Sequence, residues 1–93
     1  MNATVSPDAK PALKSGMRLQ WEPAQNSHVL LFPEGVVKLN GSASQILLRC
    51  TGEATVHEIT KELETLFNRE NLEPEVASFM AFALERQWLE LRS

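Results

Sequence analysis

A proline and a glycine divide the most apolar stretch of the chain and define where it turns. Residues 29–32 and 36–39 are apolar runs on either side of Pro33-Glu34-Gly35. Proline at the second position and glycine at the fourth position of a tetrapeptide favour a type I turn. We therefore expect the two runs to pair as an antiparallel hairpin.

The residues before this hairpin fall into two parts. Residues 17–21 alternate apolar and polar side chains, which predicts a half-buried strand that ends at Pro23. Residues 1–16 hold two of the five prolines and almost no apolar periodicity, so little burial would offset the entropy lost on ordering them. The sequence thus predicts a flexible tail over residues 1–16 and one domain over residues 17–93 that begins with a three-stranded meander.

Three helices are expected after the meander. Residues 43–50 place apolar side chains at i, i+3, i+4 and i+7, behind a capping box at residues 42–45. A second capping box at residues 55–58 opens a longer periodic stretch, and a third helix starts at Pro74 and extends the pattern towards Trp88. The predicted fold class is α+β, three antiparallel strands followed by three helices.

Composition excludes several classes of protein. A chain of 93 residues with 43% hydrophobic and 23% charged residues is typical of one small globular domain. It has no apolar run near the about 18 residues of a membrane span and no signal-peptide pattern, which predicts a cytoplasmic protein without a membrane partner. The single cysteine, Cys50, and two histidines favour neither a disulfide nor a zinc site. No nucleophile or acid–base motif is visible, so we expect no enzyme activity and no cofactor.

The same order of elements also fits a winged-helix DNA-binding regulator, which is the alternative function. From Glu22 onward, six basic residues stand against eleven acidic ones. A duplex-binding face needs clustered basic side chains to displace counterions. The charge pattern therefore favours no nucleic-acid partner.

The hairpin leaves one feature that points to binding. Residues 36–39 contain no proline and offer main-chain N–H and C=O groups at an edge of the meander, where an extended peptide can add as another strand. Alternatively, Val36 and Val37 serve only as core residues and Lys38 protects the edge against aggregation. The same edge also fits a second copy of the chain, as in a homodimer.

The segment LLFPEGVVKLN at residues 30–40, followed by Ala43, Ile46-Leu47 and Cys50-Thr51-Gly52, resembles the PqqD family of pyrroloquinoline quinone biosynthesis. The likeness extends over residues 18–91. It implies a winged-helix-like fold that recognises the precursors of ribosomally made, modified peptides.

The resemblance implies a non-catalytic carrier for the precursor peptide PqqA. The carrier would present PqqA to PqqE, a radical S-adenosylmethionine enzyme whose iron–sulfur clusters belong to that partner. The family also places the peptide between the last strand of the meander and the third helix. The residues that this assigns to peptide binding are Val36, Val37, Lys38, Leu39, Val76, Met80, Ala83 and Leu84.

Overall fold

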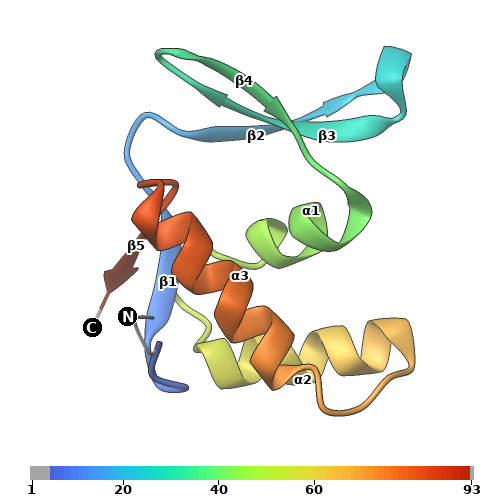
Figure 1. Ribbon diagram of the computed structural model, residues 1–93, viewed down its shortest axis with the longest axis vertical. Helices are drawn as coiled ribbons and strands as arrows, with labels where there is room; N and C mark the ends of the chain where they lie inside the picture. The colour runs from blue at the N-terminus through green and yellow to red at the C-terminus, as the bar shows by residue number, and fades with distance from the viewer. Residues whose placement is uncertain (1–4, 93) are drawn as a thin grey trace.

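The structure is a computed structural model that describes residues 5–92. The strands form two small sheets, and the helices lie between and below these sheets (Figure 1). The strands and helices are β1 (Lys10–Leu13), β2 (Arg18–Glu22), β3 (Ser27–Phe32), β4 (Gly35–Lys38), α1 (Gly41–Leu48), α2 (Val56–Phe67), α3 (Glu73–Glu85) and β5 (Leu89–Arg92).

The predicted meander is confirmed. Strands β2, β3 and β4 form an antiparallel sheet in that order, and β3 turns into β4 at the pair Phe32 and Gly35. One face of the sheet packs on the helices through Leu30, which is fully buried, together with its cross-strand neighbours Leu19 and Val37. The α+β class, with three helices after the meander, is confirmed as well.

The prediction of a flexible tail is wrong for residues 5–16, while residues 1–4 lie outside the described residues. Strand β1 pairs antiparallel with β5 and thereby joins the two ends of the chain. Its middle residues, Pro11 and Ala12, are buried. On its other edge, the Gly52 N–H donates to the Pro11 carbonyl at 2.9 Å. The domain therefore includes residues 5–16, which are ordered by a strand partner from the opposite end of the sequence.

Helix α1 starts differently from the prediction. The Asn40 side chain accepts a hydrogen bond from the Ala43 N–H at 2.8 Å, so Asn40 is the N-cap. The capping box expected at residues 42–45 is wrong, because Ser42 already lies within the helix and the Gln45 side chain accepts a hydrogen bond from Arg49 instead. Asn40 thus follows closely on the end of β4 and caps the first turn of α1.

Helix α2 has the predicted capping box. The Thr55 hydroxyl accepts from the Glu58 N–H at 3.1 Å, and the Glu58 carboxylate accepts from the Thr55 N–H at 2.8 Å. The hydrogen bond from the Thr55 backbone lowers the pKa of Glu58. These bonds satisfy helix N–H groups that have no partner within the helix.

A Thr55→Ala variant is expected to lower the free energy of unfolding by about 1 kcal/mol, because the first turn of α2 loses its cap. For a domain of this size, that loss lowers Tm by about 4–8 °C, which circular dichroism measures. Thr65→Ala, on the exposed part of the same helix, is the control and leaves Tm near the wild-type value. Equal melting of Thr55→Ala and wild type would contradict the role of the cap.

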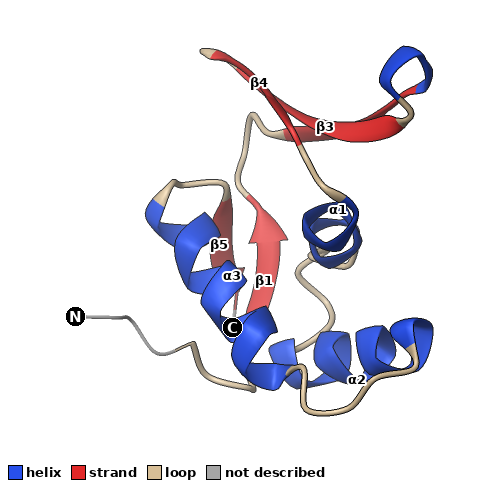
Figure 2. Ribbon diagram, turned by 45° about the vertical axis from the view of Figure 1, so that its right-hand side comes forward, coloured by secondary structure: helices blue, strands red, loops and turns tan. Residues whose placement is uncertain are grey.

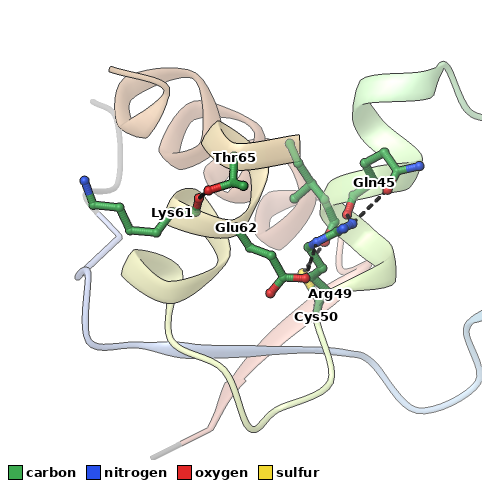
Figure 3. A network of polar contacts seen from close by, with 7 residues as sticks. Gln45, Arg49, Cys50, Lys61, Glu62 and Thr65 are labelled. Atoms are coloured by element: carbon green, nitrogen blue, oxygen red, sulfur yellow. Dashed lines mark hydrogen bonds and ion pairs between the residues drawn. The ribbon is translucent and has the colours of Figure 1, made fainter. Parts of the chain in front are cut away.

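The helices are held together by one core and by a polar link. Arg49, at the end of α1, donates to Glu62 of α2 at 2.9 Å and to the Gln45 side chain at 2.8 Å (Figure 3). The carboxylate of Glu64 accepts from the Leu72 N–H at 3.1 Å, which ties the end of α2 to the start of α3 and lowers the pKa of Glu64. The first link thus joins α1 to α2, and the second positions the start of α3 against α2.

Candidate functional site

Strand β4 is an open edge of the three-stranded sheet. Within residues 5–92 it pairs only with β3, and Figure 2 shows it above α1 and α3. Val36 is 59% exposed, although valine is apolar. The structure therefore places the predicted binding strand where another chain can reach it.

The register of the hairpin decides which main-chain groups of β4 are free. The Leu39 N–H donates to the His28 carbonyl at 3.0 Å, so this pair is hydrogen-bonded. Hydrogen-bonded and non-hydrogen-bonded pairs alternate along an antiparallel ladder. The pair Val37 and Leu30, two residues along, is therefore hydrogen-bonded too. It follows that the N–H and C=O groups of Val36 and Lys38 point away from β3.

Side chains divide β4 in a different way. Leu39 is buried in the core and Val37 packs against it, whereas Val36 and Lys38 lie on the opposite face and are exposed. Of the four predicted residues, Val36 and Lys38 thus present both main chain and side chain to a partner. Val37 and Leu39 instead hold the strand on the domain.

An apolar cavity lies next to the end of β4. Its volume is about 200 Å³, it is open on one side, and it is lined by the start of α1, the end of α2, the α2–α3 connection and the first half of α3. Ile46, Leu63 and Phe79 contribute apolar surface, while Asn40 connects the cavity with the strand. It suits an apolar side chain better than a charged one.

The α3 residues predicted for the groove are mostly core residues, and this part of the prediction needs correction. Met80 and Ala83 are fully buried as part of the core cluster, and so offer no contact surface. Val76 is almost as buried but lines the cavity. Leu84 is half-buried against the core and is not among the residues that line the cavity.

Two aromatic residues of α3, Phe79 and Phe82, form the accessible apolar surface that the sequence analysis missed. Phe79 lines the cavity, and Phe82 is 43% exposed with its ring edge-on to Trp88 at 5.5 Å between centroids. The guanidinium of Arg86 covers the Phe82 ring at 4.5 Å. Phe79, three residues after Val76, lies on the border of the apolar stripe that periodicity predicts to be buried, and Phe82 falls outside this stripe.

A second hollow continues along α3. It has a volume of about 510 Å³ and lies between the β3–β4 turn and the end of α3, where Pro33 and Glu34 face Arg86 and Trp88. Together, the cavity and this hollow flank the two ends of β4. No β4 residue lines either space; the two spaces instead adjoin the chain just before β4 at Glu34 and just after it at Asn40.

Reactive groups contribute little to this site. The Cys50 thiol is buried and donates to the Ile46 carbonyl at 3.2 Å. Among residues 5–92, no group of His, Cys, Asp and Glu side chains gathers to hold a metal ion. In the same range, none of the helices combines the length and apolar character needed to cross a bilayer.

The buried thiol gives a direct prediction. Burial raises the pKa of Cys50 from 9.0 to about 12. At pH 8 this raised pKa leaves a thiolate population about 1000-fold below that of an ordinary cysteine, and only the thiolate reacts. Reaction with Ellman's reagent is therefore slow in the native protein and fast after unfolding in guanidinium chloride. Because the unfolded thiol ionises first, this burial also reduces stability above pH 9.0. Equal native and unfolded rates would contradict the burial.

Comparison with known proteins identifies the family. The profile described as Coenzyme PQQ synthesis protein D (PqqD) matches residues 27–89. Relatives named PqqA binding protein include one from Stutzerimonas stutzeri strain A1501, 45% identical and covering 88% of this chain and 90% of its own length. Another, from Azotobacter vinelandii strain DJ, is 48% identical and covers 87% and 89%.

A solved structure agrees with the family in fold. The solution structure of the PqqD truncation of Methylobacterium extorquens PqqCD, described as a functional, stand-alone recognition element for ribosomally synthesised and modified peptides, is 28% identical. The TM-score is 0.79, and the match covers 96% of each chain. With the family profile and the two relatives, this likeness shows that the chain belongs to the PqqD family.

Proposed function

We propose that this protein is a non-catalytic, cytoplasmic carrier that binds the precursor peptide PqqA and presents it to the radical enzyme PqqE. The observation that carries the proposal is the open β4 edge beside an apolar cavity. The names of the relatives, which describe PqqA binding, support the same peptide. Catalysis and its cofactors belong to the partner enzyme.

The binding mode is addition of PqqA as an antiparallel strand next to β4. The N–H and C=O groups of Val36 and Lys38 supply the pairing positions, and an apolar side chain of the peptide enters the cavity lined by Phe79. Strand β2 is the other edge of the sheet, but the cavity adjoins the end of β4 at Asn40. This difference favours β4 over β2.

The expected affinity follows from a small number of contacts. Four main-chain hydrogen bonds contribute about 0.5–1.5 kcal/mol each, and two buried apolar side chains about 1.5–3 kcal/mol each. Ordering a flexible peptide and immobilising it on the protein offset part of this gain. We therefore expect a dissociation constant in the micromolar range or somewhat below. An affinity of this strength permits transfer of the peptide to an enzyme.

The proposal is tested by titrating ¹⁵N-labelled protein with synthetic PqqA and then with PqqE. Chemical-shift changes at Val36 and Lys38 and around Phe79 support strand addition, and a scrambled PqqA sequence is the control. Changes confined to the exposed face of α2 would contradict it. Retention of PqqA when PqqE is added, with one ternary complex in sedimentation, supports presentation to the enzyme.

A further inference from the structure

The face of the three-stranded sheet that points away from the core carries its own charge pattern. Cross-strand partners share a face, so this outer face holds Arg18, Gln20 and Glu22 of β2, the alternate residues of β3, and Val36 and Lys38 of β4. Its charges are two basic and one acidic, in a chain with 9 basic and 12 acidic residues. The outer face is thus locally basic in an acidic protein.

Lys38 is the basic residue of this face that borders the open edge. Its cross-strand neighbours are Val29 on β3 and, beyond it, Gln20 on β2, which are both uncharged. No carboxylate of the described residues forms an ion pair with Lys38. The adjacent cross-strand pair on this face carries no charge, because it joins Val36 to Leu31. A strand added at β4 therefore meets an unpaired ammonium group at one position and apolar side chains two residues away.

We infer that Lys38 selects an acidic side chain on the bound peptide; this rests on the proposed strand addition. In an antiparallel guest strand, meaning a peptide paired with β4, the residue opposite Lys38 precedes the residue opposite Val36 by two positions. The first is aspartate or glutamate and the second is apolar. The intervening residue, opposite Val37, points to the core side of the sheet. Directly opposed side chains lie about 4.5–5.5 Å apart at Cβ, close enough for the carboxylate to meet the ammonium group.

Lys38 also has a simpler role as protection of an edge strand against aggregation. The two roles differ in the sign of the charge they require. A protective charge works equally well as glutamate, whereas selection of an acidic peptide residue is reversed by glutamate. Charge reversal at Lys38 therefore separates the two.

The test is calorimetric titration of synthetic PqqA into Lys38→Gln and Lys38→Glu variants. We expect Lys38→Gln to bind about 2- to 5-fold more weakly, the range for exposed cross-strand charge pairs. Lys38→Glu should bind about 10-fold more weakly, because repulsion between like charges adds to the lost attraction. The matched control is Arg18→Gln, on the same face but at the opposite edge strand. Two strand spacings separate it from β4, about a Debye length at physiological salt, so its affinity stays within about twofold of wild type.

A second set of titrations identifies the peptide residue. PqqA variants in which one acidic residue at a time becomes lysine are titrated into Lys38→Glu. One of them regains affinity by about 5-fold or more, and that residue is the partner of Lys38. The inference is overturned if Lys38→Glu binds PqqA like the wild type, and equally if Lys38→Glu binds weakly but no charge swap in PqqA restores its affinity.

The outcomes for Lys38 and for strand addition are distinguishable. When wild-type Val36 and Lys38 amides shift on PqqA addition but Lys38→Glu keeps full affinity, only charge selection fails. When wild-type protein shows no shift at either amide, strand addition itself fails. Circular dichroism of each variant confirms that the fold is retained, as expected for a substitution at an exposed residue.

Discussion

A Val36→Pro variant is expected to remain folded and to bind PqqA at least about tenfold more weakly than wild type. The Val36 N–H points away from β3, so proline removes no hydrogen bond of the hairpin. It does remove a donor for the guest strand, and its ring occupies the space in which that strand lies. Edge strands tolerate proline when the missing N–H faces outward. Titration calorimetry measures the affinity, and thermal melting measures the fold.

The neighbouring position gives the control for this prediction. Val36→Thr keeps the N–H and the β-branched shape, and it should bind PqqA nearly as well as wild type. Val37→Pro loses a bond to β3 instead, so it should lower Tm. Unchanged PqqA affinity in folded Val36→Pro would show that the peptide binds elsewhere. Unchanged stability in Val37→Pro would show that the register of the hairpin differs from the one described.

Met80→Ala is expected to lower the free energy of unfolding by about 2–5 kcal/mol, because it leaves a void in the core. Met80 is fully buried, in contact with the core rather than with the peptide site. Urea denaturation followed by circular dichroism measures the loss. The affinity of the remaining folded protein for PqqA is expected to stay near the wild-type value.

Phe79→Ala should show the opposite pattern, since Phe79 is only half-buried and lines the cavity. We expect a smaller loss of stability than for Met80→Ala and a loss of PqqA affinity of about tenfold, for one apolar contact of the peptide. A large loss of PqqA affinity in folded Met80→Ala, with no loss in Phe79→Ala, would instead indicate that the peptide binds the face of α3 that carries Met80.

Local sequence patterns predicted the parts of the fold that depend on near neighbours. The turn at Pro33, the hairpin around it and the capping box at Thr55 each involve residues a few positions apart. Strands β1 and β5 were missed because Lys10 pairs with Arg92, more than 80 residues away along the chain. Residues 10–13 show no alternation, and the alternation of residues 89–92 is only four residues long and directly follows the third helix. Pro11 also disfavours a strand by its residue type, although the structure places it, buried, within β1.

The site was predicted less completely than the fold, for a geometric reason. Apolar spacing marked Val76, Met80 and Ala83 as one face of α3, and this face packs into the core. The two phenylalanines of α3, Phe79 and Phe82, stay at least partly accessible, and we expect the peptide to contact these instead. Periodicity identifies the buried stripe of a helix first, so a second apolar surface beside it is easily assigned to the wrong residues.

The pairing of β1 with β5 brings both ends of the domain to one corner. In Figure 1 this corner lies at the lower left, while β4 crosses the top of the molecule. A linker attached at either end would leave from the side remote from the peptide edge. Attachment to another protein at this corner would therefore leave the β4 edge uncovered; the solved relative is itself a PqqD truncation of the PqqCD protein.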